Sequence, residues 1–354
     1  ADTFYIEIDY MVDTDHTHMP QPDEIAAVVQ MFACEGHTLV IDVDDAITHY
    51  DVLLRDPSDN SFFDYNSVAN SYGKIKDDNF DRAGNSQWHY GLFAHQYEDT
   101  VGSTTGSSGL GQRPGRLFLV SLGNFTGEVG TPFERASTLA HEFGHNLGLT
   151  HCGTMNCGDD TDIDYVGQGS PVLASIMSYQ YQLAGVKEQM IALGMAREDA
   201  SLIKELDFSH GRMCPQDESN LDEDFGSGMN PVDWDCSGTI GGIVAVDLLS
   251  EGSAATRHWC QNSVDGTTTI RDYAEWENIS ASASPEFLAS AAAEPEEVMC
   301  ITAEEWEEIY TTQGIQQPTL EIEPCNTGKI VFVDPNTTIP ELATGSCFQP
   351  VGSI

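Results

Sequence analysis

Eleven residues near the middle of the chain have the types and spacing of a metal-binding motif. The segment HEFGHNLGLTH spans residues 141–151. On a helix, His141 and His145 lie one turn apart on the same face, so their two imidazoles can bind one metal ion. A turn after the helix would bring His151 to the same ion. Three imidazoles leave a fourth tetrahedral position open for water, which is the pattern of catalytic rather than structural zinc.

Glu142 lies beside the face that carries the first two histidines, where its carboxylate can reach a zinc-bound water. Zinc lowers the pKa of such a water from about 16 to about 7, and Glu142 can accept the proton and pass it to the departing amine of a peptide bond. Gly148 is the left-handed residue that ends the helix and turns the chain toward His151. HExxH alone recurs by chance, but the full motif after a capped helix start is much more specific. The spacing therefore predicts peptide-bond hydrolysis assisted by Glu142.

Capping residues and hydrophobic periodicity predict the elements that position this motif. Thr131, Pro132 and Glu134 form a capping-box start, so the zinc helix is expected to run to about residue 147. Alternating apolar and polar side chains predict strands, and the strands together with the helices predict an α+β fold. The expected strands cover residues 3–10, 37–43, 88–97 and 116–123, two further helices cover 22–34 and 183–195, and a Gly/Ser/Thr-rich loop covers 100–112.

These motifs resemble those of the metzincin zinc endopeptidases, in which HExxHxxGxxH is followed by a methionine-containing turn. The segment ASIMSY at residues 174–179 is similar to that turn, and its sequence is most similar to the turns of astacins and serralysins. The resemblance implies that Met177 forms the hydrophobic base beneath the zinc histidines. It also implies that Tyr179 reaches the zinc or the reaction oxyanion, with a buried packing tyrosine as the alternative.

The resemblance covers residues 1–180 and implies a metzincin-like catalytic domain, a twisted mixed sheet with a zinc helix. Its cleft is expected between that helix and an edge strand, where a peptide binds extended. The chain departs from astacins at Cys152, where they have an acidic residue, and it lacks the calcium-binding repeats of serralysins, so the subfamily stays unassigned. No cysteine resembles a latency switch.

The chain changes character after about residue 210, where short segments, glycines and aspartates predominate. This predicts a zinc protease domain over residues 1–210 and a disulfide-rich, calcium-binding region over 211–354. Eight of the nine cysteines follow residue 150, which predicts up to four disulfides formed in an oxidising compartment. Sequential pairing, with Cys260 bonded to Cys300, is one possibility, and Cys34 is the expected odd thiol.

A calcium loop is predicted in the segment NPVDWDCSG, residues 230–238. Acidic and hydroxyl side chains alternate there, and Gly238 permits a sharp turn. An ordinary Asp-rich turn is the alternative. The candidate calcium ligands are Asp233, Asp235, Ser237, the carbonyl of Thr239, and Asp247 in place of a terminal glutamate.

Other polar clusters are interpreted as solvated loops. These are the aspartates at 159–164 and those at 42–45. His16 and His18 could together bind a metal, but a polar connection leaving the first strand is the favoured interpretation. His95, on a predicted strand, carries no further signal.

The net charge excludes several classes of partner. Fifty-seven acidic residues against 14 basic ones give a formal charge of -43, which argues against nucleic acid and anionic membranes. Hydrophobic residues make up 40%, enough for a core, and no apolar run approaches a membrane span. We expect a monomeric, secreted, halotolerant enzyme, in its mature form, that acts on protein or peptide substrates in saline surroundings.

Two alternatives remain open. One is a catalytically inactive binding or adhesion protein that keeps this fold. The intact Glu142 argues against this alternative. The other is a zinc hydrolase directed at peptidoglycan or a glycoprotein, with residues 212–354 as a carbohydrate-binding module.

Overall fold

The structure, a computed structural model, describes residues 2–151, 173–192, 204–246, 269–282, 296–307 and 318–322, with short gaps within 204–246, 269–282 and 296–307. The chain forms two compact units, and each is built from more than one segment. The first comprises Ala1–Leu149, Ile279–Glu307 and Thr319–Cys325, and the second comprises Thr150–Asn278, Glu308–Pro318 and Asn326–Ile354. The predicted division into domains at residue 210 stays a prediction.

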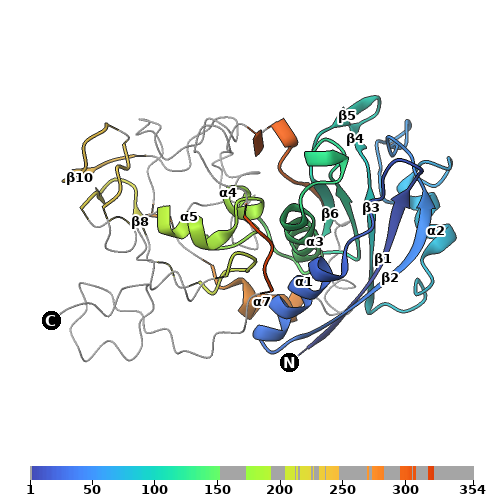
Figure 1. Cartoon of the computed structure of the whole chain (residues 1–354), viewed down its shortest axis with the longest axis horizontal. Coiled ribbons are helices and arrows are strands. Elements are labelled where there is room, and N and C mark those ends of the chain that lie inside the picture. The colour runs from blue at the N-terminus through green and yellow to red at the C-terminus, as the bar shows by residue number, and fades with distance from the viewer. Residues whose placement is uncertain are drawn as a thin grey trace. The chain divides into compact units, whose positions relative to one another are not determined.

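One mixed sheet organises the first unit (Figure 1). Among the described residues it has six strands in the order β12-β6-β7-β3-β1-β2. The four strands β2, β1, β3 and β7 run parallel, whereas β6 and β12 are antiparallel to their neighbours. The strands are β1 (Thr3–Val12), β2 (Thr38–Thr48), β3 (Trp88–Ala94), β6 (Gly109–Arg113), β7 (Leu117–Ser121) and β12 (Glu296–Met299).

Helices α1 (Pro22–Cys34) and α3 (Pro132–Asn146) pack together on one face of this sheet. Their aromatic side chains meet the first strand: the ring of Phe4 lies 5.7 Å from that of Phe32 and 6.0 Å from that of Phe143. A buried ion pair joins the two helices, because Arg135 donates to both carboxylate oxygens of Glu24. Apolar burial therefore fixes α3 against the sheet, and the ion pair fixes its register along α1.

The opposite face of the sheet is covered by α2 (Tyr72–Asn79) and the chain before it. Tyr72 is fully buried there, and its hydroxyl donates to the carbonyls of Tyr90 and Phe118. Acidic groups on this face also have partners. Glu7 accepts from Arg82 at 2.7 Å, and Asp9 accepts from the hydroxyl of Tyr90 at 2.7 Å.

The helix predicted over residues 22–34 and the zinc helix occur at the expected positions. The expected loop at 100–112 is wrong, because it contains β5 (Ser103–Thr105) and most of β6. The predicted strand 88–97 is interrupted at its end: β3 stops at Ala94, and β4 (Tyr97–Thr100) pairs with β5. The aspartates at 42–45 are also not a loop, since they belong to β2, where Asp42 and Asp44 pair with Arg82.

Short elements make up the described part of the second unit. Its helices include α4 (Tyr179–Gln182) and α5 (Val186–Ala192), so the helix predicted over 183–195 begins three residues later than expected, and its last three residues lie outside the described residues. Gly185, at φ 77°, separates α4 from α5. The remaining elements are the two-residue strands β8 (Gln216–Asp217), β9 (Leu221–Asp222), β10 (Ile243–Val244) and β11 (Thr269–Ile270), and α7 (Glu275–Ser282), which continues into the first unit. Among all described helices, none combines the length and apolar character needed to cross a membrane.

The two described cysteines differ from the expected pattern. Cys34 is disulfide-bonded, so it is not the odd thiol. Cys300 is a free, buried thiol, so the suggested bond between Cys260 and Cys300 is also wrong. Cys34 lies half-buried at the end of α1 rather than in the core, and is therefore available for bonding. The other seven cysteines lie outside the described residues.

Candidate metal centre

The start of α3 is fixed by the predicted capping box. The hydroxyl of Thr131 accepts from the backbone N–H of Glu134 at 3.3 Å, and the carboxylate of Glu134 accepts from the N–H of Thr131 at 2.7 Å. The indole N–H of Trp306 adds a third bond, to the same carboxylate, at 2.9 Å. These contacts satisfy helix-end groups that would otherwise be buried without partners.

The end of α3 sets the orientation of His145. Gly148 has φ 95°, as expected for the left-handed residue that terminates a helix. The N–H of Leu149 then bonds back to the carbonyl of Gly144 at 3.0 Å. This turn places the carbonyl of Leu149 2.9 Å from Nδ1 of His145. Because that Nδ1 acts as the donor, Nε2 is the unprotonated ring nitrogen and has the lone pair that a metal ligand needs.

Two histidines of the predicted motif converge in the first unit. Nε2 of His141 lies 3.0 Å from Nε2 of His145, and Cys300 Sγ joins them, with all three ligand atoms within 4.8 Å of one another. All three residues are buried. Burial, together with the neighbouring His141, lowers the pKa of His145 well below its ordinary value, so this ring is neutral. Neutral imidazole and thiolate are zinc ligands.

Glu142 is also fully buried, beside these groups. Its Oε1 accepts from the thiol of Cys300 at 2.6 Å, and its Oε2 has no hydrogen-bond partner among the described residues. Burial raises the pKa of Glu142 well above its ordinary range. Burial raises the pKa of the Cys300 thiol as well, and the Glu142 carboxylate adds to this effect. Without a cation nearby, the carboxyl and the thiol both favour their protonated forms.

Glycines of β6 allow α3 to approach the sheet this closely. A Cβ atom at Gly109 would lie 2.0 Å from Oε1 of Glu142, and one at Gly111 would lie 2.9 Å from Cβ of His145. The two glycines are two residues apart, so they face the same side of the strand. Sequence reasoning placed this segment in a loop and missed them. Glycines at alternate positions of a strand were the available signal of close backbone approach.

The edge of β6 opposite β7 is paired with β12 of the same chain. β12 pairs with β6 in antiparallel register, with Val298 opposite Gly111 and Met299 opposite Leu110. The pairing continues to Cys300, whose carbonyl accepts from the hydroxyl of Ser107 at 2.9 Å. Residues 296–300 therefore occupy the edge of β6 that lies beside α3, where an extended peptide was predicted to bind. The expectation that no cysteine resembles a latency switch stays a prediction, and the structure adds the contact of Cys300 Sγ with Oε1 of Glu142 at 2.6 Å.

The remaining residues of the predicted centre belong to the second unit. The rings of His151 and Tyr179 lie 4.2 Å apart, centroid to centroid, and both side chains are buried. Met177 is fully buried, and its backbone N–H donates to the hydroxyl of Ser175 at 3.0 Å. The turn is therefore packed and internally bonded, and the role of Met177 as a base beneath the histidines stays a prediction.

The predicted calcium loop is also part of the second unit. The carboxylate of Asp233 accepts from the N–H of Ser237 at 3.0 Å and from that of Gly238 at 2.8 Å. Gly238 has φ 79°, so it makes the expected sharp turn. The Ser237 hydroxyl donates to the carbonyl of Thr239 at 3.1 Å.

A glutamate outside that loop joins the acidic group. Carboxylate oxygens of Glu223, Asp233 and Asp235 lie within 4.8 Å of one another. Sequence reasoning missed Glu223, which is buried and accepts from the N–H of Trp234 at 3.0 Å. Asp247 and the aspartates at 159–164 lie outside the described residues.

Comparison with known proteins adds little to this geometry. No family model matches the chain, and no curated protein matches it. Among solved structures, the chain is similar to a zinc-dependent peptidase from Methanocorpusculum labreanum at 15% sequence identity. The match covers 43% of this chain and 85% of that one, with a TM-score of 0.26.

Proposed function

We propose that the protein is a zinc-dependent endopeptidase whose centre is formed by α3. The observation that carries this proposal is the convergence of two buried imidazoles with a buried carboxyl group. Nε2 of His141 and of His145 lie 3.0 Å apart, and the unpartnered Oε2 of Glu142 lies in the same buried group of side chains. These residues fit a zinc ion, because tetrahedral nitrogens at about 2.1 Å from zinc are about 3.4 Å apart.

His151 is the proposed third ligand. Two residues of extended chain span at most about 7 Å, so His151 cannot lie far from Leu149. The carbonyl of Leu149 contacts His145 directly. The covalent chain thus supports the placement that the HExxHxxGxxH spacing predicts.

The chemistry follows from the groups around this centre. Zinc, when bound, supplies a Lewis acid that activates water and polarises a peptide carbonyl. A nearby dication also favours the ionised form of Glu142. Glu142 then accepts a proton at Oε2 and returns it to the departing amine. Tyr179 is the proposed donor to the oxyanion, and Met177 the proposed packing base beneath the histidines.

Glu142→Gln tests this proposal. We expect casein hydrolysis to fall by about 10²–10⁴-fold, because the amide cannot shuttle a proton, while zinc content stays at the wild-type value. His37→Asn, a change in another histidine of the first unit, should leave both unchanged. A Glu142→Gln variant as active as wild type would contradict the proposal.

The contact of Cys300 with Glu142 favours a second candidate, a closed zinc centre without catalysis. A cysteine together with three histidines is a structural zinc set that leaves no position for water. Cys300 Sγ lies 4.0 Å from Nε2 of His145, and β12 occupies the edge where a peptide would bind.

Cys300→Ala separates the two candidates. If the site is a peptidase that its own chain blocks, this variant should hydrolyse casein faster than wild type, and adding Glu142→Gln should abolish the gain. If neither wild type nor Cys300→Ala cleaves casein while both bind zinc, the closed centre is the correct function.

We further propose that the protein acts outside the cell in saline surroundings and binds calcium in its second unit. The disulfide at Cys34 supports an oxidising compartment. The charge of -43 supports a surface adapted to salt. The convergence of Glu223, Asp233 and Asp235 supports calcium, which prefers carboxylate oxygens.

A further inference from the structure

Four histidines that lie outside the α3 centre converge at one end of the sheet. Strands β1, β2 and β3 run parallel, so their carboxyl ends lie at the same edge. Each of these ends is followed by histidine: one directly after β2, one directly after β3, and two in the connection that leaves β1. We call this group the four-histidine cluster; it consists of His16, His18, His49 and His95.

The connection after β1 presents its two histidines on one side. Thr17 bridges back to Val12, and the N–H of His18 donates to the carbonyl of Met11 at 2.9 Å. His16 and His18 flank Thr17 and so share a face of this extended segment. Their Nε2 atoms lie 3.1 Å apart.

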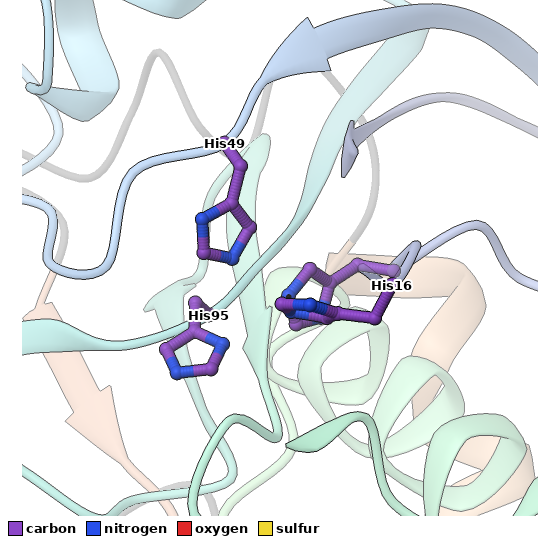
Figure 2. A group of neighbouring side chains, drawn as sticks. His16, His49 and His95 are labelled. Atoms are coloured by element: carbon purple, nitrogen blue, oxygen red, sulfur yellow. Dashed lines mark hydrogen bonds between the residues drawn. The ribbon is translucent and has the colours of Figure 1, made fainter. Parts of the chain in front are cut away.

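All four imidazoles surround one point. One ring nitrogen from each lies within 4.8 Å of the others. The six centroid separations fall between 4.7 and 5.5 Å, as a tetrahedral arrangement requires. Figure 2 shows a ring nitrogen of His49 and one of His95 directed toward the ring of His16. Three segments far apart in sequence therefore contribute ligands from different directions.

Hydrogen bonding within the protein does not satisfy this cluster. Nε2 of His49 and Nδ1 of His95 are buried and have no hydrogen-bond partner among the described residues. The His49 side chain is only 8% exposed. Buried polar atoms without partners destabilise a fold. A cation at the centre would give each of these nitrogens a partner.

An acidic residue is placed to orient the rings. The carboxylate of Asp13 lies 3.5 Å from Nδ1 of His16 and 3.6 Å from Nδ1 of His49. Asp13 is itself held by backbone N–H groups of Asp15 and His16 at 2.8 and 2.9 Å. Asp51 lies 3.6 Å from the same Nδ1 of His49. A carboxylate behind a ligating histidine fixes the ring and strengthens its basicity.

We propose that the four-histidine cluster binds one divalent transition-metal ion, with zinc as the expected metal. Imidazole ligands favour zinc, copper and nickel over calcium and magnesium. Four protein ligands leave no open position, so the ion is structural rather than catalytic. It joins the carboxyl ends of the three parallel strands β1, β2 and β3. The prediction that residues 13–18 form a plain polar connection was based on His16 and His18 alone, which are two of the four ligands.

Zinc stoichiometry tests the site in the full-length protein. The double variant His141→Asn/His145→Asn removes the α3 centre and serves as the host. After chelation, reloading with zinc chloride and gel filtration, the host should retain one zinc per chain by mass spectrometry. Adding His49→Asn should reduce this to near zero, whereas His37→Asn should leave it at one. A host that retains no zinc, or an equal content with His49→Asn, would overturn the proposal.

A milder variant keeps the test decisive if His49→Asn does not fold. Asp13 is partly exposed, so Asp13→Asn leaves the four ligands and the packed rings in place. We expect it to weaken zinc binding in the host by about 10–100-fold, as loss of a supporting carboxylate does. Zinc should also raise the melting temperature of the host, and less so with Asp13→Asn. Unchanged zinc affinity and no thermal response to zinc would refute the site.

Discussion

The close approach of α3 to β6 predicts a graded response to added methyl groups. In Gly109→Ala, the new Cβ would lie 2.0 Å from Oε1 of Glu142 and 2.6 Å from the carbonyl oxygen of Leu119. The Glu142 side chain could rotate, but the Leu119 carbonyl belongs to β7 and cannot move without disturbing the β6–β7 pairing. In Gly111→Ala, the nearest atoms are 2.9 and 3.0 Å away. Gly84 has no atom within 4 Å, so Gly84→Ala is the matched control.

The expected magnitudes follow these distances. Overpacking in a core costs about 1–3 kcal/mol, and each kcal/mol lowers the melting temperature of a domain of this size by about 2–4 °C. We expect a loss of about 4–12 °C for Gly109→Ala, about 2–4 °C for Gly111→Ala and less than about 1 °C for Gly84→Ala. Thermal unfolding should be followed by circular dichroism in chelator, so that altered metal binding does not contribute.

A second readout connects this packing to the proposed chemistry. Because displacement of a catalytic group by about 1 Å can cost about 10²-fold in rate, Gly109→Ala should also reduce peptide hydrolysis strongly. If Gly109→Ala melts within 1 °C of Gly84→Ala in chelator, the close contact between α3 and β6 is refuted.

Four other predictions concern separate features. Tyr179→Phe should lower kcat by about 10²-fold with little change in KM, as loss of an oxyanion donor does; an equal kcat would assign Tyr179 to packing alone. Burial raises the pKa of Asp9 to about 6, so the folded state favours the neutral carboxyl and loses this stabilisation as pH rises from about 4 to above 6. Asp9→Asn should therefore gain up to about 3 kcal/mol over wild type between pH 4 and 7 in urea unfolding, and a difference independent of pH would contradict this. In Asp233→Asn, the calcium concentration at the midpoint of the rise in melting temperature should be at least tenfold higher than in wild type. Identical calcium titrations would rule out the loop. At fixed calcium, sodium chloride should raise the melting temperature by screening the net charge of -43; a steady fall toward marine salt would oppose this.

Local features of the chain could be predicted from sequence alone. The capping box of Thr131 and Glu134, the helix over 22–34 and the positive φ of Gly148 were all predicted correctly. Each depends on residues within about one turn of one another, and the relevant hydrogen bonds close short rings. The pairing of His141 with His145 follows in the same way from helix geometry.

Features decided by the tertiary structure involve residues far apart in the chain. Cys300 contacts Glu142 across 158 positions, and no local pattern marks either residue for the other. The extended form of Gly109 and Gly111 depends on pairing with β7 and β12, so composition alone suggested a loop. The four-histidine cluster forms because parallel strands end at a common edge, which only the strand order determines. The sequence by itself therefore determined the helix that carries the candidate zinc ligands, whereas the surroundings of that helix and the second candidate site depend on long-range packing.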